Sequence, residues 1–281
     1  MPATPHPQAQ MTDAGRAARA ALLAEPGRTL VCSDFDGVLS PIVADPDTAY
    51  ASEDAVRALQ RLGARVGKVA VITGRVARKA VELGRLSGRE GLETMSVLGL
   101  YGAERWDAAT GEFAEPEPPE GIAAAKDELP GLLRGLGLAE ARVEDKRLSV
   151  GVHTRELDDP AGALARLTQP LRDLAARHGL RVEPGRHVIE LRAPGQDKGD
   201  ALRDLIAEVD PAVVVFAGDD LGDVAAFEAV RELRASGRIE GLLVCSGSDE
   251  QDALVALADV VVEGPDGVAA LFGELADLLG A

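Results

Sequence analysis

Short apolar runs that alternate with amphipathic segments dominate both ends of the 281-residue sequence. The runs typical of buried strands are TLVCSDF (29–35), KVAVITGR (68–75), AVVVFAGDD (212–220), EGLLVCSG (240–247) and DVVVE (259–263). Segments with helical periodicity lie between or after them, at residues 52–66, 76–86, 199–209, 223–237 and 264–280. Strands that alternate with helices in this way predict a mainly parallel sheet covered by helices on both faces.

The middle of the chain has a different pattern, which begins near Leu98. It contains a hairpin (101–116), a helix that we expect to be interrupted at Pro130 (122–137), one strand (142–155), a second helix (161–179) and a strand pair (180–194). Two helices with several alternating strands favour a separate α+β layer. We therefore predict a core of residues 26–105 and 193–281, an inserted domain of residues 106–192, and a disordered or helical N-terminal segment of residues 1–25.

Composition narrows the possible functions. A formal net charge of −17 and a pI near 4.7 argue against a general nucleic-acid surface, which requires clustered Lys and Arg. No apolar run approaches the roughly 20 residues of a membrane span, and no basic and apolar leader opens the chain. Cys32 and Cys245 lie inside apolar runs, as small buried thiols do in a reducing compartment. We expect a cytoplasmic protein that binds neither nucleic acid nor membrane.

Polar side chains gather where the predicted core strands end. Asp34 and Asp36 end the first strand, Thr73 ends the second, and Asp219 and Asp220 end the third. Lys198 opens the helix that precedes this third strand. Each cluster alone is compatible with an ordinary turn or a solvated helix end. In an open parallel sheet, however, the carboxyl ends of the strands form the ligand-binding edge, and all of these groups fall there.

Such a set of groups supports phosphoryl transfer through an aspartyl-phosphate. A carboxylate can attack phosphorus and split one difficult displacement into two easier steps. Because nucleophile and phosphate are both anionic, Mg²⁺ and a fixed Lys must offset their repulsion. A second carboxylate two residues on can protonate the leaving oxygen and later activate water.

These motifs resemble those of the haloacid dehalogenase (HAD) superfamily of phosphatases, in DFDGVLS, VITGR, Lys198 and AGDDLGD. The resemblance implies a Rossmann-like parallel-sheet HAD core with an inserted α+β cap, and a Mg²⁺ cofactor. It implies that Asp34 is the nucleophile and Asp36 the general acid/base. The other implied roles are phosphoryl binding by Thr73 and Lys198, metal ligation by Asp34, Asp36 and Asp219, and outer support of the metal by Asp220 and Asp223. Val38 departs from the pattern, since the family commonly has Thr there.

A finer resemblance, from about Arg28 to the C-terminus, is to the trehalose-6-phosphate phosphatases. It depends on DFDGVLSPIV, ITGR, GLYGAE, VEDKRLSVGVHTR, GRHVIELRAPGQDKGDAL and FAGDDLGD. It implies hydrolysis of trehalose 6-phosphate in trehalose biosynthesis, and a functional pairing with a trehalose-6-phosphate synthase. The implied substrate-binding residues are Arg75, Glu144, Lys146, His153, Arg155, Arg186 and Glu190. His153 and Arg155 are equally compatible with the polar face of a half-buried strand, and Glu144, Lys146 and Arg186 with ordinary surface charges.

Other interpretations stay open. The core motifs are equally compatible with a phosphatase for another sugar phosphate, such as sucrose 6-phosphate or a hexose phosphate. An interaction protein with an inactive HAD fold is the alternative outside enzymes, although no catalytic position has been lost. A receiver domain also forms an aspartyl-phosphate, but its length of about 120 residues and its lack of an insert disfavour it.

Overall fold

The computed structural model describes residues 11–43, 45–114, 117, 120–146, 148–185, 187–192, 197–247 and 252–281. The chain divides into two compact units, residues 1–115 with 196–281, and residues 116–195. We call these units the core and the cap. The predicted boundaries at 105/106 and 192/193 stay a prediction. Arg105 itself lies within a core strand and donates to the Glu208 carboxylate at 2.6 and 2.9 Å.

The core contains an eight-stranded sheet in the order β12-β11-β10-β1-β2-β3-β4-β5. Its strands are β1 (Thr29–Ser33), β2 (Lys68–Ile72), β3 (Ser96–Gly99), β4 (Glu104–Asp107), β5 (Phe113–Ala114), β10 (Val213–Gly218), β11 (Glu240–Gly247) and β12 (Val260–Glu263). The pairs from β12 to β3 are parallel, and β3, β4 and β5 pair antiparallel. The predicted mainly parallel sheet is therefore confirmed, while β3 was missed. The predicted hairpin of residues 101–116 is formed by β4 and β5.

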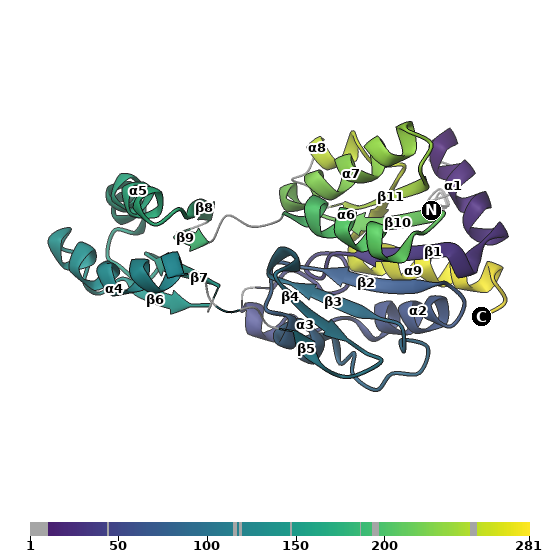
Figure 1. The fold of residues 1–281 in the computed structure, drawn as a ribbon, viewed down its shortest axis with the longest axis horizontal. Coiled ribbons are helices and arrows are strands. Elements are labelled where there is room, and N and C mark those ends of the chain that lie inside the picture. The colour runs from purple at the N-terminus through teal and green to yellow at the C-terminus, as the bar shows by residue number, and fades with distance from the viewer. Residues whose placement is uncertain are drawn as a thin grey trace, which may run out of the picture. The chain divides into compact units, whose positions relative to one another are not determined.

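Helices cover both faces of the core sheet (Figure 1). They are α1 (Asp13–Ala24), α2 (Glu53–Gly63), α3 (Ala77–Gly84), α6 (Lys198–Val209), α7 (Val224–Ala235), α8 (Asp252–Val255) and α9 (Gly264–Leu278). Short 3₁₀ helices are η2 (Pro26–Arg28), η3 (Pro46–Thr48), η4 (Leu100–Gly102) and η5 (Leu221–Asp223). Of the long helices, α1, α2, α3 and α9 pack on one face, and α6 and α7 on the other.

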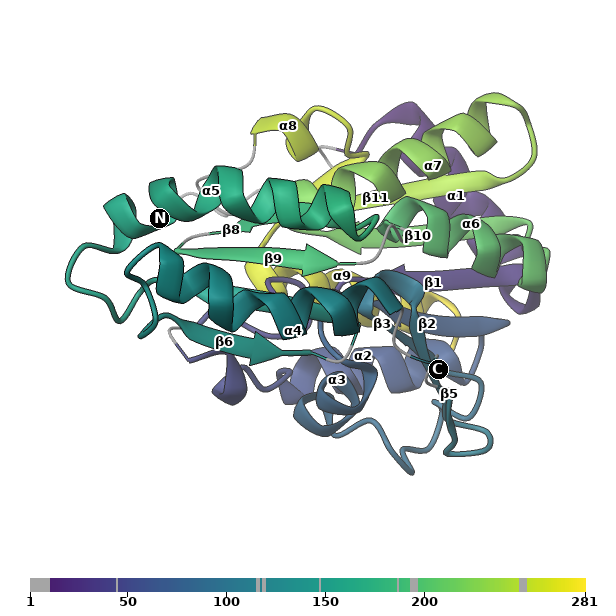
Figure 2. The same ribbon diagram turned by 60° about the vertical axis from the view of Figure 1, so that its left-hand side comes forward.

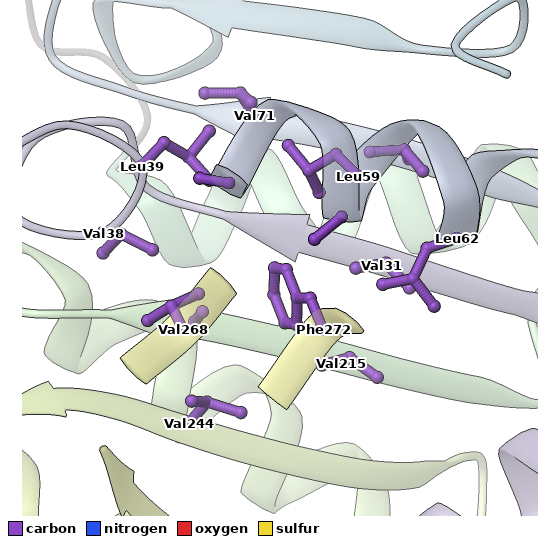
Figure 3. Close-up of a cluster of buried hydrophobic side chains, with 14 of the residues drawn as sticks. Val31, Val38, Leu39, Leu59, Leu62, Val71, Val215, Val244, Val268 and Phe272 are labelled. Carbon is purple, nitrogen blue, oxygen red and sulfur yellow. The ribbon is translucent and has the colours of Figure 1, made fainter. Parts of the chain in front are cut away.

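Apolar packing holds these layers together. Phe272 of α9 lies among Leu59 and Leu62 of α2 and Val31 and Val215 of adjacent strands (Figure 3). Each of these side chains is at most 1% exposed. Full burial of such a side chain contributes about 1.5–3 kcal/mol, so this layer fixes the strands whose ends carry the polar clusters.

The cap is a four-stranded antiparallel sheet in the order β6-β7-β9-β8. Its elements are α4 (Glu120–Gly135), β6 (Arg142–Asp145), β7 (Ser149–His153), α5 (Pro160–Arg177), β8 (Arg181–Gly185) and β9 (Val188–Arg192). Helices α4 and α5 cover one face of this sheet, where Val150, Val152, Ile189 and Leu191 are buried (Figure 2). The opposite face carries the alternating polar side chains. The predicted α+β character of the insert is confirmed.

Two details of the cap differ from the sequence-based expectation. Residues 142–155, predicted as one strand, form the hairpin of β6 and β7, in which Lys146 N donates to Ser149 O at 3.0 Å. Helix α4 continues through Pro130 instead of ending there. Pro130 is exposed, so the backbone hydrogen bond that it cannot donate is lost on the solvent side.

The N-terminal segment is helical where the structure describes it. Thr12 caps α1 by accepting from Gly15 N at 3.0 Å, and Met11 is buried. Residues 1–10 of the segment predicted to be disordered or helical lie outside the described residues. Among the helices that the structure describes, none combines the length and the apolar composition needed to cross a membrane.

Candidate active site

Asp34 lies directly after β1, and its main-chain N–H donates to Ala217 O of β10 at 2.8 Å. The residue is 5% exposed, and its Oδ2 is 2.9 Å from Lys198 Nζ. Burial raises the pKa of Asp34 to about 7, opposed by Lys198 and reinforced by the charge of Asp223. A buried carboxylate beside a fixed ammonium group therefore stands at the end of the central strand.

Lys198 is the first residue of α6, and Asp197 caps the helix by accepting from Asp200 N at 2.9 Å. Its Nζ contacts Asp34 and also donates to Asp223 Oδ1 at 2.7 Å. Burial alone would lower the pKa of Lys198, but the two carboxylates outweigh burial and raise it. Lys198 is therefore a permanent positive charge in the site.

Three further carboxylates follow β10. One oxygen of each of Asp34, Asp219, Asp220 and Asp223 lies within 4.8 Å of the others. Burial, followed by repulsion from Asp34 and Asp223, raises the pKa of Asp219 to about 8. Four carboxylates around one ammonium group leave an excess of negative charge, and oxygen donors suit a hard divalent cation. The residues present thus fit a bound metal ion.

Asp223 has a different environment from the other members of this cluster. It is fully buried, and its Oδ2 accepts from the main-chain N–H groups of Asp219 (2.9 Å) and Asp220 (3.2 Å). Its Oδ1 accepts from Lys198. Asp223 therefore holds the loop after β10 and orients Lys198.

Thr73 and Arg75 follow β2. The Thr73 side chain is buried, and its Oγ1 accepts from Arg75 N at 3.2 Å, which leaves the hydroxyl hydrogen available to a ligand. Arg75 Nε and Nη2 donate to the two oxygens of Asp36 at 2.6 and 2.7 Å. Asp36 is 38% exposed in its side chain. The structure thus brings the predicted core residues to one edge of the sheet.

The predicted cap residues form two hydrogen-bonded groups around Gly151 of β7. Glu190 Oε2 accepts from Lys146 Nζ at 2.7 Å. On β6 and β7, Glu144 Oε2 is 2.7 Å from His153 Nε2. In the sheet register Glu144, Gly151 and Glu190 stand in one row. A Cβ at Gly151 would lie 3.4 Å from His153 Nε2 and 3.8 Å from Glu144 Oε2, so the missing side chain leaves room for this pair beside Gly151.

The remaining predicted cap residues are placed less fully. Arg155 is exposed in the turn after β7 and does not lie on the strand. Arg186 lies outside the described residues.

Two serines were missed by the sequence analysis. Ser149 Oγ donates to Glu190 Oε1 at 2.6 Å, and the alternation in LSVGVH was the only signal for its polar face. Ser246, at the end of β11, donates to Gly37 O at 2.6 Å and so holds the loop that carries Asp36. No local pattern links Ser246 to that loop.

The parallel sheet, with these polar groups at its carboxyl edge and an inserted α+β unit, defines a haloacid dehalogenase-like fold. Among the solved structures to which this chain is similar, two illustrate the shared fold. The C-terminal domain of C. albicans trehalose-6-phosphate phosphatase matches with a TM-score of 0.69 and 21% identity, over 92% of this chain and 96% of that one. A haloacid dehalogenase-like hydrolase from Bacteroides thetaiotaomicron matches with a TM-score of 0.62 and 15% identity, over 88% of this chain and 98% of that one.

The sequence assigns the chain to a narrower family than the fold does. Residues 32–260 match the trehalose-phosphatase family, and the chain belongs to that family. A trehalose-phosphate phosphatase from Mycobacterium marinum is 34% identical over 261 residues, which are 90% of this chain and 62% of that protein. The chain thus spans less than two thirds of that relative's length.

Proposed function

We propose that this protein hydrolyses trehalose 6-phosphate to trehalose and inorganic phosphate through an aspartyl-phosphate on Asp34. The observation that carries the proposal is the buried Asp34 carboxylate 2.9 Å from Lys198 Nζ, at the carboxyl end of β1 in a chain of the trehalose-phosphatase family. An ammonium group in this place lowers the cost of bringing an anionic nucleophile to an anionic phosphate.

The reaction has two displacements. In the first, an Asp34 oxygen bonds to phosphorus, the bond from phosphorus to the sugar oxygen breaks, and Asp36 gives its proton to that oxygen. In the second, water attacks phosphorus, Asp36 takes a proton from the water, and the bond from Asp34 to phosphorus breaks. Thr73 and Lys198 hold the phosphoryl oxygens in both steps.

Mg²⁺ is the cofactor that we propose. Asp34, Asp219 and the main-chain carbonyl of Asp36 would hold it, supported by Asp220 and Asp223. When bound, the ion supplies positive charge that offsets the repulsion between nucleophile and phosphate. Oxygen donors alone, without His or Cys, favour Mg²⁺ over softer metals.

The polar face of the cap sheet is the proposed recognition surface for the sugar. Glu144, Lys146, His153, Arg155, Arg186 and Glu190 are the assigned residues. A site built to pair with sugar hydroxyls rejects analogues that leave its polar groups unmatched. Glu190→Ala should lower kcat/KM for trehalose 6-phosphate about tenfold or more and hardly affect an aryl phosphate. Equal losses on both substrates would assign Glu190 a structural role.

A phosphate-release panel with the purified protein tests the substrate. Trehalose 6-phosphate should exceed sucrose 6-phosphate and glucose 6-phosphate in kcat/KM, and turnover should require a divalent cation. Preference for another sugar phosphate would transfer the assignment to that substrate. Asp34→Ala should abolish turnover, and retention of a tenth of the parent rate would contradict the covalent mechanism. A folded parent protein that releases no phosphate from any of them would favour the inactive interaction protein.

The cellular context is also a proposal. The substrate is the product of a trehalose-6-phosphate synthase, and we propose a functional pairing of the two activities in the cytoplasm. A coupled assay checks the pairing, since trehalose should accumulate from the synthase's substrates only when both proteins are present.

A further inference from the structure

The Arg75 guanidinium uses all three of its nitrogen atoms within the protein. Nε and Nη2 donate to Asp36 Oδ2 and Oδ1 at 2.6 and 2.7 Å, and Nη1 donates to the main-chain oxygen of Pro46 at 2.8 Å. The side chain is 14% exposed. A two-pronged contact of this kind fixes the plane of a carboxylate as well as its position. Arg75 was predicted to bind substrate, which stays a prediction, and three of its five N–H donors are directed at Asp36 and Pro46.

The rest of Arg75 is held as firmly as its guanidinium. Its main-chain N–H donates to Thr73 Oγ1 at 3.2 Å, and its carbonyl accepts from Leu100 N at 2.8 Å. The guanidinium carbon lies 5.6 Å from the centre of the Phe35 ring, which is fully buried. Arg75 is therefore fixed after the end of β2 and contacts the ring of Phe35, the residue between Asp34 and Asp36.

Asp36 has little else to define its orientation. Its side chain is 38% exposed, and its other side-chain contact among the described residues is Ser40 Oγ at 3.5 Å, the outer limit of a hydrogen bond. An aspartate on a surface turn without a strong partner samples several rotamers. A group that transfers a proton must instead stay within hydrogen-bond reach of the atom that receives it.

We propose that Arg75 is a positioning residue that holds the Asp36 carboxylate in the orientation needed for proton transfer. The inference rests on the proposed function, because it assigns Asp36 the proton for the leaving oxygen. Without Arg75 the carboxylate is present but rotates freely, and the fraction of time spent in the productive geometry falls. The contact with Pro46 extends the same restraint to η3, so that the turn of residues 45–48 and Asp36 are held by one side chain.

Leaving-group dependence separates this role from the alternatives. An alkyl phosphate such as trehalose 6-phosphate needs a proton on its leaving oxygen, whereas 4-nitrophenyl phosphate releases a stable anion. Arg75→Met should lower kcat/KM about tenfold or more for the sugar phosphate and less than about threefold for the aryl phosphate, part of the 10²–10⁴-fold of general acid catalysis. Lys79→Met is the matched control. It removes another side-chain contact with η3, the ion pair of Lys79 with Asp47 at 3.3 Å, and should change neither value.

A double-mutant cycle completes the test. In an Asp36→Asn background Arg75→Met should cause no further loss on the sugar phosphate, because the group that it orients no longer carries a proton. Arg75→Lys, which keeps the charge but cannot form the two-pronged contact, should recover only part of the rate.

Equal losses on both substrates, with a raised KM and additivity with Asp36→Asn, would overturn the proposal and assign Arg75 to substrate binding. If the parent protein prefers a different alkyl phosphate, the ratio is measured with that substrate, so failure of the sugar assignment is distinguished from failure of the role of Arg75. A parent protein that releases phosphate from no alkyl phosphate would overturn both.

Discussion

Replacing Asp223 by Asn is the sharpest test of how the core site is held together. Asp223 is fully buried and accepts three hydrogen bonds, from Lys198 Nζ (2.7 Å), Asp219 N (2.9 Å) and Asp220 N (3.2 Å). All three partners are donors, so both side-chain oxygens must accept. An amide has one oxygen only, and its NH₂ group will face either the ammonium group or the two main-chain N–H groups.

The size of the effect follows from these contacts. A buried donor that loses its acceptor costs about 1–3 kcal/mol, and breaking a buried ion pair costs about 3–5 kcal/mol. Lys198 keeps Asp34 as a partner, and removing one negative charge relieves repulsion on Asp34 and Asp219. We therefore expect Asp223→Asn to lower the free energy of unfolding by about 2–4 kcal/mol, below the sum of the separate costs.

Thermal unfolding in the presence of a chelator measures this difference without a contribution from bound metal. With an unfolding entropy of about 2.1 cal/mol/K per residue, the midpoint should fall by about 3–7 °C for a chain of this size. Asp220→Asn is the control, because Asp220 is exposed and its Oδ1 accepts from Gly222 N, a bond that the Asn oxygen can also accept. If the two variants unfold at the same temperature, the reasoning from the three donors is wrong.

Four further predictions concern the same edge of the sheet. The raised pKa values of Asp34 (about 7) and Asp219 (about 8) mean that the metal-free folded protein retains protons that the unfolded chain has lost, so its stability should fall as pH rises from about 5 to 8. The proposed Mg²⁺ ion would have to displace those protons, so calorimetry should show roughly tenfold or more tighter binding at pH 8 than at pH 6; equal affinities would contradict this. Gly37→Ala would place a Cβ 2.0 Å from Asp219 Oδ2 and should weaken Mg²⁺ binding, whereas Gly88→Ala, at the same φ of +69° in open space, should not. Ser33 Oγ is buried and has no hydrogen-bond partner among the described residues. Ser33→Ala should therefore leave the free energy of unfolding unchanged or raise it by up to about 1 kcal/mol, whereas a clear loss of stability would indicate a bound water.

The core of this fold was predictable because its signals are local. A strand such as β1 is an apolar run of the length typical of strands. The start of α2 is indicated by Ser52, which caps the helix by accepting from Ala55 N at 3.1 Å. Once the strands are parallel, the residues that follow them must share an edge, so Asp34, Thr73 and Asp219 could be grouped without knowledge of any distance.

The β6–β7 hairpin was not predictable on the same basis. The sequence between the two strands, residues 146–148, contains no Gly, Pro, Asn or Asp, so the usual turn signals are absent from it. Apolar residues alternate with others in both RVED (142–145) and LSVGVH (148–153), so the two segments together have the pattern of one long strand. The pairing is set instead by burial of Val150 and Val152 against α4 and α5, which is a tertiary effect.

Helix α4 shows the opposite error, in which a strong local signal was overruled. Pro130 indicated an interruption, but Ile122, Ala125, Leu129 and Leu133 keep helical spacing across it and are all buried. The apolar face therefore continues on both sides of the proline. Its packing on the cap sheet compensates for one missing hydrogen bond.

The different roles proposed for Asp34 and Asp36 depend on environments that the DFDG motif does not reveal. Asp34 is 5% exposed beside Lys198, and Asp36 is 38% exposed in its side chain beside Arg75. A nucleophile benefits from exclusion of water and from a fixed cation, whereas a proton carrier must be within reach of the leaving oxygen and then of the attacking water. If these environments decide the roles, Asp34 cannot be replaced by Asp36 in the same active site. An Asp34→Asn protein should then form no aspartyl-phosphate at Asp36, and labelling of Asp36 by phosphate in that variant would contradict the argument.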